Sequence, residues 1–519
     1  MTIIMDKNRY MLGVDIGTTS TKAVLFRENG EIVASENNGY ELYTPDIYTA
    51  EQDPEDIFQA VLLSIGNVMK KSGIDPEDLL FISFSSAMHS VIAIDENHQA
   101  LTRCITWADN RSSQWADKIK EELHGHDIYI RTGTPIHPMS PLCKIAWLEH
   151  DVPEVANKTK KYIGIKEYVF HKLFNQYAVD YSIASCTGFM NLESLSWDQG
   201  ALQVAGITKD KLSPIVSTTE VFTGCNRTWA EQMEILPETP FVIGASDGVL
   251  SNIGVGAIKK GEVAVTIGTS GAIRTVIPKP QTDPKGRIFC YALTKDYWVI
   301  GGPINNGGII FRWIRDELAA SETETAKRLG MDPYDVLTKI ASMVKPGAEG
   351  LLFLPYLSGE RAPFWNADVR GSFIGLTLSH KREHLVRAAL EGVIYNLYSV
   401  FLALAEVMDH PVTSIKATGG FARSELWRQM LADIFDQEVI VPESYESSCL
   451  GACLLGLYAF GQIDSFDVVE DMIGETYKHK PDFSHVQEYR KLVPIFIRLS
   501  RTLEKEYGSI AEYQSELTK

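Results

Sequence analysis

Apolar residues in the first 90 positions form short continuous runs separated by polar turns, followed by one helical repeat. The runs "MLGVDIG" and "KAVLF" flank the polar turn "TTST", and "EIVASENN" follows as a third strand. Residues 54–71 have helical spacing, and Asp53–Pro54 suits an N-cap followed by the first helical residue. "LLFISFSSAM" (79–88) is typical of a buried strand. This order predicts an α/β domain with a mixed sheet.

The second half of the chain repeats this order. "GEVAVTIGTSGAIRTV" and "YWVIGGPI" are predicted strands around turns, residues 305–320 and 384–408 are predicted helices, and "IKATGG" (415–420) is a strand that leads into a helix from about Ser424. A chain of 519 residues is too long for one core. We therefore expect two domains, 1–256 and 257–519, with a ligand cleft between them.

Composition narrows the classes of partner. The net charge of -18 argues against a general nucleic-acid or membrane-surface binder. The N-terminus lacks an apolar signal region, and the apolar stretch "CLLGLYAF" (453–460), taken as the longest, is too short to span a bilayer. The seven cysteines form no CxxC pair, so Cys449 and Cys453 are expected in a core. We expect a cytoplasmic protein with a small-molecule partner and neither nucleic acid nor membrane.

One phrase occurs twice. "GVDIGTTSTKAVLF" (13–26) aligns with "AVTIGTSGAIRTV" (264–276) on the shared Ile-Gly-Thr. A turn of Gly, Thr and Ser after a buried strand presents N–H groups and hydroxyls to an anion, so two such turns predict a grip on different phosphates of one nucleotide. Asp15 of the first copy falls on Thr266 of the second. One Mg²⁺ needs one principal carboxylate, and Asp15 is the predicted metal residue.

A second carboxylate, Asp247, follows the apolar strand of "FVIGASDG" (241–248), between two glycines. An Asp in a glycine turn is usually a turn residue. A carboxylate at a strand end near two phosphate loops can also take the proton of a sugar hydroxyl. The paired loops favour the second interpretation, a catalytic base.

Two further groups of residues suit a sugar and an adenosine. His89 in "SSAMHS" (85–90) and the Trp, Asp and Arg of "ITWADNR" (105–111) offer hydrogen-bonding groups beside an aromatic face. "ATGGFARS" (417–424) joins a strand to a helix through two glycines, where an adenosine could lie on bare backbone. The alternatives are a structural histidine and an ordinary β–α turn.

These motifs resemble, over nearly the whole chain, the FGGY family of carbohydrate kinases within the actin–hexokinase–Hsp70 superfamily. "MSPLCKIAWLEH" (139–150) and "GSFIGLTLSHKREHLVRAALEG" (371–392) resemble the two family signatures. The resemblance implies two actin-like (ribonuclease H-like) domains, an ATP- and Mg²⁺-dependent transfer to a sugar, and closure of the two lobes.

The resemblance also implies roles for individual positions. Asp247 matches the catalytic base and Asp15 the metal residue. The positions implied for nucleotide binding are Gly17, Thr18, Thr19, Ser20, Lys22, Gly268, Thr269, Ser270, Gly307, Gly308, Gly419, Gly420 and Arg423. The positions implied for the sugar are Met88, His89, Trp107, Asp109, Arg111 and Asp247.

The choice of sugar depends on the same resemblance. Xylulose kinases carry Gln-Met-His-Gly where this chain has Ala87-Met88-His89-Ser90, whereas "AMHSV" and "ITWADNRS" are similar to gluconate kinases of the family. We expect phosphorylation of D-gluconate to 6-phospho-D-gluconate, with xylulose or another ketose or polyol as the alternative. A gluconate carboxylate needs a cation, and Arg111 is the first candidate, with His89 as a further donor. Arg111 bracing Asp109 is nearly as well supported.

The sequence leaves two alternatives from other functional classes, a non-catalytic sensor and a phosphatase. A non-catalytic sugar or nucleotide sensor on the same fold would not need both Asp15 and Asp247, and a phosphatase of the superfamily would not need the sugar-side cluster. The resemblance is compatible with a homodimer.

Overall fold

The computed structural model describes residues 9–442 and 446–517, which divide into two compact units. Unit 1 contains residues 9–259, 276–300 and 446–474, and unit 2 contains residues 260–275, 301–442 and 475–517. Each unit is therefore assembled from three separate stretches of the chain. The expected division into domains 1–256 and 257–519 stays a prediction. The two compact units do not coincide with these halves, because residues 276–300 and 446–474 belong to unit 1.

Unit 1 is built on a six-stranded mixed sheet of order β13-β14-β5-β1-β2-β3. Its strands are β1 Tyr10–Ile16, β2 Ser20–Arg27, β3 Ile32–Gly39, β5 Leu79–Ser86, β13 Val221–Phe222 and β14 Phe241–Ser246. β1 pairs antiparallel with β2 and parallel with β5, which in turn pairs parallel with β14. The predicted strand–turn–strand start and the mixed sheet are confirmed.

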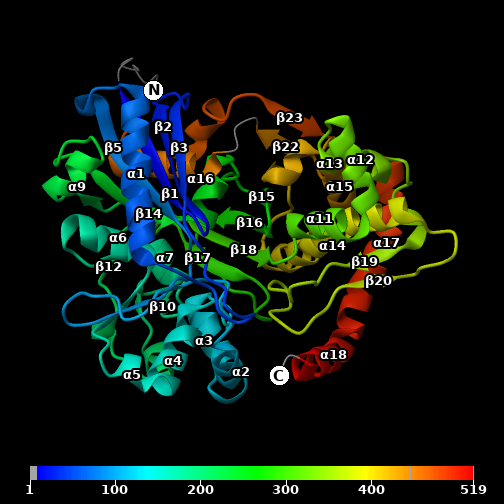
Figure 1. Cartoon of the computed structure of the whole chain (residues 1–519), viewed down its shortest axis with the longest axis horizontal. Coiled ribbons are helices and arrows are strands. Elements are labelled where there is room, and N and C mark those ends of the chain that lie inside the picture. The colour runs from blue at the N-terminus through cyan, green and yellow to red at the C-terminus, as the bar shows by residue number, and fades with distance from the viewer. Residues whose placement is uncertain (1–8, 443–445, 518–519) are drawn as a thin grey trace. The chain divides into compact units, whose positions relative to one another are not determined.

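Helix α1 (Pro54–Ser72) covers one face of this sheet, across β2 and β3 (Figure 1). Asp53 accepts a hydrogen bond from the Glu55 N–H at 2.9 Å, and Pro54 is the first helical residue, as the sequence predicts. α16 (Ser447–Ala459) contacts β1, β5 and α10 (Asp247–Gly254). Cys449 and Cys453 are buried in the core there, as expected.

The remaining elements of unit 1 are short. The helices are α2 Ser113–Glu122, α3 Gly125–Thr132, α4 Pro141–Asp151, α5 Pro153–Ala156, α6 Ile165–Phe174, α7 Tyr181–Ser185, α8 Gln199–Ala205 and α9 Arg227–Gln232. The strands are β4 Glu51–Gln52, β6 Ile92–Ile94, β7 Cys104–Ile105, β8 Lys161–Ile163, β9 Val179–Asp180, β10 Met190–Asn191, β11 Ser196–Trp197, β12 Ile215–Val216 and β17 Phe289–Ala292. Short 3₁₀ turns lie at Pro76–Asp78, Lys209–Lys211 and Phe466–Asp471.

Unit 2 is built on strands that lie in one sheet in the order β18-β16-β15-β21-β22-β23. They are β15 Glu262–Ile267, β16 Gly271–Ile277, β18 Trp298–Ile304, β21 Ser414–Thr418, β22 Val439–Pro442 and β23 Thr476–His479, and a separate pair is formed by β19 Leu352–Leu354 and β20 Ser372–Ile374. β15 pairs antiparallel with β16 and parallel with β21, which repeats the arrangement of β1, β2 and β5.

The helices of unit 2 are α11 Gly308–Trp313, α12 Ala320–Leu329, α13 Pro333–Ser342, α14 Arg382–Val407, α15 Glu425–Phe435, α17 Phe483–Thr502 and α18 Glu504–Leu517. Short 3₁₀ turns lie at Ala348–Gly350 and Gly420–Arg423. The helix predicted over 305–320 is only partly correct, because α11 passes into a π-helical turn, Ile314–Leu318.

Residues 453–460 are not the longest apolar segment. By length and composition alone, one helix among the described residues, α14, could cross a membrane, and 72% of its apolar window is buried. α14 packs against β19, α13 and α15, as the core helix of unit 2.

Candidate active site

Three strand ends of unit 1 bring two carboxylates to one edge of its sheet. In the parallel register, Asp15 on β1 lies opposite Ser85 on β5, and Ser86 lies opposite Ser246 on β14. The Ser85 hydroxyl donates to Asp15 Oδ1 at 2.6 Å. Asp247 follows Ser246 directly. The two carboxylates predicted for metal and base thus belong to neighbouring parts of one sheet edge.

The local structure at Asp247 differs from the expected glycine turn. Asp247 is the first residue of α10, and its Oδ1 accepts from the Gly248 N–H at 2.6 Å. Strand β14 thus runs directly into α10, which places the Asp247 carboxylate at the N-terminus of the helix.

The electrostatic surroundings of Asp15 favour its protonated form. Burial and the charge of Asp247 raise the pKa of Asp15 from 3.8 to about 6, against the opposing effects of the Ser85 hydrogen bond and of Lys22. Lys22 does not serve Asp15 alone, because its Nζ lies 3.0 Å from both carboxylate oxygens of Glu446. The charges of Asp247, Glu446 and Lys22 therefore all act on Asp15.

The residues present fit a divalent cation. Asp15 and Asp247 are hard oxygen ligands whose mutual repulsion a cation would relieve. Mg²⁺ typically binds through one or two carboxylates, its own waters and the phosphates of a substrate. No group of three or more His, Cys, Asp or Glu side chains among the described residues forms a complete metal cage. The pair suits Mg²⁺ that arrives with a nucleotide.

The first predicted phosphate loop, residues 17–20, is fixed by side chains from other segments of unit 1. Tyr40 donates to the Gly17 carbonyl at 2.5 Å, and Trp107 Nε1 donates to Thr18 Oγ1 at 2.9 Å. Gln52 donates its side-chain amide to the Thr18 carbonyl. Three side chains thereby hold the loop in place, and Tyr40 and Gln52 are supporting residues that sequence reasoning missed.

Asp109 and Arg111 form a bracing network. Asp109 is fully buried and accepts from the Ala50 N–H at 2.9 Å and from Arg111 Nε at 3.0 Å. Arg111 Nη2 pairs with Glu51, and its guanidinium carbon lies 4.9 Å from the Trp147 ring centre. The structure favours the bracing alternative for Arg111 over a substrate carboxylate as its principal partner.

His89 lies in the loop between β5 and β6, next to the half-buried Met88. The His89 side chain is 5% exposed, and its Nδ1 lies 2.8 Å from the Cys186 carbonyl. A carbonyl only accepts, so Nδ1 carries the proton and Nε2 of the neutral ring is an acceptor. A neutral His89 therefore suits a sugar hydroxyl, and donates to a carboxylate only when protonated.

The second predicted phosphate loop, residues 268–270, joins β15 to β16 in unit 2. The Gly308 N–H donates to the Gly268 carbonyl at 2.7 Å, and the Ile309 N–H donates to the Thr269 carbonyl at 3.1 Å. A Cβ on Gly307 would lie 2.4 Å from the Ser270 carbonyl oxygen. The predicted Gly307 and Gly308 thus support this loop by close backbone contact.

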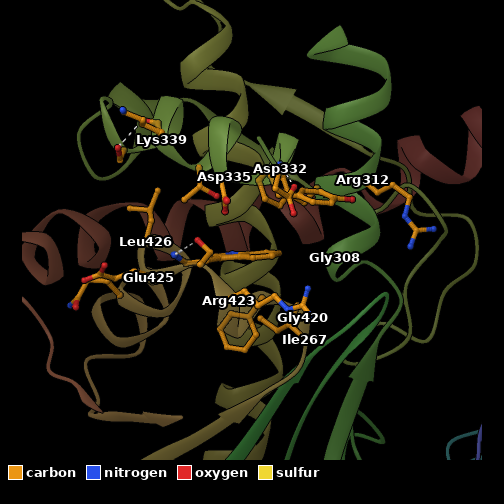
Figure 2. Close-up of a pocket in the computed structure, with 18 of the residues that line it drawn as sticks. Ile267, Gly308, Arg312, Asp332, Asp335, Lys339, Gly420, Arg423, Glu425 and Leu426 are labelled. Carbon is orange, nitrogen blue, oxygen red and sulfur yellow. Dashed lines mark hydrogen bonds between the residues drawn. The ribbon is translucent and has the colours of Figure 1, made fainter. Parts of the chain in front are cut away.

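A cavity of about 750 Å³ opens beside this loop, entirely within unit 2. Figure 2 shows Asp332, Asp335 and Lys339 on one side of it and Ile267 and Gly420 on the other. Of the predicted nucleotide positions, five line it: Gly268, Thr269, Gly308, Gly420 and Arg423. Gly419 has φ 105, and a Cβ there would lie 2.4 Å from the Ile267 carbonyl oxygen, so a side chain is excluded.

Aromatic side chains line the same cavity. The ring of Phe311 lies 5.0 Å from that of Tyr334 and 5.7 Å from that of Trp427, measured between centres. Flat apolar walls beside a Gly/Thr/Ser loop suit a base and its phosphates. These aromatic residues, with Asp332, Asp335 and Lys339, were missed from the sequence. "DPYD" (332–335) reads as an ordinary helix start, and Asp332 does cap α13.

Residues 10–254 match the N-terminal domain of the FGGY family of carbohydrate kinases, and residues 263–460 match its C-terminal domain. The chain belongs to the FGGY family of carbohydrate kinases. Kinases of this family take the phosphoryl group from ATP. The predicted family and enzyme class are confirmed.

Similar proteins and solved structures match this chain over nearly its whole length. The chain is 70% identical to a gluconokinase of Bacillus subtilis (strain 168) over 98% of this chain and 99% of that protein. A gluconate kinase structure from Lactobacillus acidophilus superposes with a TM-score of 0.90 at 37% identity, over 97% of this chain and 99% of that one. A ligand-bound xylulose kinase structure from the same species superposes with a TM-score of 0.90 at 37% identity, over 97% of this chain and 100% of that one. The two-domain actin-like fold of FGGY kinases is therefore that of this chain.

Proposed function

We propose that this FGGY kinase transfers the γ-phosphoryl group of ATP to the 6-hydroxyl of D-gluconate. The observation that carries the proposal is the 70% identity, over 98% of the chain, to a gluconokinase. Motifs that differ between sugar-specific branches agree with it, since Ala87-Met88-His89-Ser90 lacks the Gln and Gly of xylulose kinases.

Unit 1 supplies the groups for the accepting hydroxyl. Asp247 orients the hydroxyl and takes its proton as the phosphoryl group moves in line. Met88, His89 and Trp107 bind the sugar, while Arg111 fixes Asp109 beside it. Positioning and electrostatic stabilisation supply most of the rate in such a reaction, because no covalent step on the protein is needed.

Both phosphate loops and the unit 2 cavity bind the nucleotide. Thr18, Thr19, Ser20 and Lys22 present donors from the first loop, and Thr269 and Ser270 from the second. The base lies in the cavity walled by Phe311, Tyr334 and Trp427, with Gly420 and Arg423 at its edge. Asp15 would hold Mg²⁺, which supplies charge neutralisation on the phosphates when it is bound.

The principal alternative is a ketose or polyol acceptor. It is favoured by one observation, the equal structural similarity to a ligand-bound xylulose kinase. A second alternative, a non-catalytic sugar or nucleotide sensor, would bind nucleotide without turnover. We further propose that the enzyme acts in the cytoplasm, and the homodimer remains a prediction.

The test is a coupled assay of ADP release with ATP and Mg²⁺ against gluconate, xylulose, ribulose, glycerol and no sugar. We expect kcat/KM for gluconate to exceed that for each other sugar by at least about 100-fold, since a site built around a substrate group rejects analogues that leave it unpaired. A ketose preference would replace gluconate as substrate, and the absence of any sugar-dependent release would support the sensor.

A further inference from the structure

A fully buried lysine in the first family signature has no role in the chemistry described above. Lys144 lies in the second turn of α4, and its side chain is 0% exposed. Its ammonium group donates to the His89 carbonyl at 2.8 Å and to the Met139 carbonyl at 2.7 Å. Burying a lysine is costly, so its retention at this place needs a reason.

The first of these carbonyls belongs to a residue in an unusual conformation. His89 has φ 70, in the left-handed region that side chains other than glycine rarely adopt. The cost of such a conformation must be met by its surroundings. The hydrogen bond from Lys144 fixes the peptide group that follows His89, and the Cys186 carbonyl fixes the ring.

The second carbonyl belongs to a segment that leads to the other sugar-side residues. Met139 is next to Pro138, whose carbonyl accepts from the Ser112 hydroxyl at 3.2 Å. Ser112 directly follows Arg111, which braces Asp109. Lys144 therefore ties the His89 loop to the segment that carries Asp109 and Arg111.

The charge of Lys144 is not essential to these contacts. Burial lowers the pKa of Lys144 to about 7, although the charge of Asp109 opposes the shift. A neutral amine still has two N–H groups, and two carbonyls need two donors. The link between the two segments is thus maintained in either protonation state.

We propose that Lys144 is a positioning residue for the sugar, which holds the His89 peptide in its left-handed conformation and joins it to the segment before α4. The proposal rests on the proposed function only in that His89 contacts the acceptor. Loss of the link should shift His89 and weaken the binding of the sugar, and it should leave the unit 2 nucleotide cavity unchanged.

The test is the Lys144→Met enzyme, which keeps the length of the side chain and removes its N–H groups. We expect KM for gluconate to rise at least 10-fold and KM for ATP to change less than 2-fold, since small displacements of positioning groups have large kinetic effects. Cys143→Ala is the matched control. Cys143 is a fully buried neighbour on the same helix, and its loss should leave both KM values within 2-fold.

A double-mutant cycle shows whether Lys144 acts through His89. His89→Gly removes the ring and tolerates φ 70 without strain. We expect Lys144→Met to add less than 2-fold to the KM of the His89→Gly enzyme. A further 10-fold rise in the double mutant would overturn the proposal, as would equal changes in both KM values of the single mutant.

Two further measures keep the test decisive. If Lys144→Met does not fold, Lys144→Gln takes its place and is judged by the same pair of KM values, because its amide nitrogen ends one carbon short of the lysine Nζ and does not reach both carbonyls. If the wild-type enzyme prefers another sugar, that sugar replaces gluconate. The proposed function then fails while the role of Lys144 is still tested.

Discussion

At the scale of single residues, Asp15 and Asp247 show how a site can be prepared at the expense of stability. Burial, and after it the charge of Asp247, raises the pKa of Asp15 to about 6. In the unfolded chain this carboxyl titrates near 3.8, so between pH 4 and 6 the folded state holds more protons and stability falls as pH rises. Above about pH 6 the full repulsion is present.

Asp15→Asn should therefore stabilise the metal-free protein at pH 7 by about 1–2 kcal/mol and have little effect at pH 4. The same change should abolish Mg²⁺-dependent turnover. Urea unfolding at the two pH values, beside an activity assay, checks both. Equal stability of the two proteins at pH 7 would mean that the carboxylates do not repel each other in the folded state.

Trp107 offers a second prediction at this scale. Its indole N–H donates to Thr18 Oγ1, so the Thr18 hydroxyl hydrogen is directed elsewhere, where it can meet a phosphate. Trp107→Phe keeps an aromatic face and loses the N–H. We expect KM for ATP to rise about 5–10-fold, the worth of one hydrogen bond, with a smaller change for the sugar.

Thr18→Ala provides the control for this prediction. In that background, Trp107→Phe should have little further effect on KM for ATP, because the shared hydrogen bond is already lost. A Trp107→Phe enzyme whose KM for ATP is unchanged would contradict the role of the Trp107–Thr18 hydrogen bond in the loop, and would leave Trp107 with its proposed contact to the sugar alone.

At the scale of elements, glycine contacts fix α16 against the rest of unit 1. A Cβ on Gly451 would lie 2.0 Å from the Leu250 carbonyl oxygen on α10, and one on Gly13 would lie 2.3 Å from the Cys449 carbonyl oxygen. Two backbones this close leave no side chain to give way. The close packing brings α16 over the strand that carries Asp15.

Gly451→Ala should destabilise the protein by about 2–4 kcal/mol because backbone must move. Gly508→Ala is the matched control, since Gly508 lies inside α18 with no atom within 4 Å of its Cβ position. There the better helix propensity of alanine should stabilise by about 0.5–1 kcal/mol. Thermal unfolding of the two variants measures both. Similar melting temperatures would contradict the role of the glycine contacts.

Elements with strong local signals were predictable from the sequence. β1, β2, α1 with its Asp53 cap, and the paired strands β15 and β16 appear where their patterns indicate. The failures are places where tertiary packing decides. The π-helical turn after α11 and the start of α10 at Asp247 have no periodicity of their own. The longest apolar segment lies in α14 and not at residues 453–460, where we expected it from the sequence.

At the scale of the whole molecule, the repeated phrase accounts for both loops, but most of the surroundings of the site come from distant segments. Gln52, Tyr40, Ser85 and Glu446 reach the predicted residues through contacts that no local pattern contains. The aromatic walls of the unit 2 cavity arise in the same way. The sequence motifs therefore predicted which chemical groups the site contains, whereas the residues that support these groups could be identified only from the folded structure.

The measurement that tests the account most directly is gluconate-dependent ADP release by the wild-type enzyme and by Asp247→Asn, with ATP binding measured separately by calorimetry. The account predicts strong gluconate-dependent release by the wild type and a loss of about 10³-fold in kcat for the variant, with ATP affinity unchanged, because the variant lacks only the base. Turnover retained by Asp247→Asn, or a wild-type enzyme indifferent to gluconate, would contradict it.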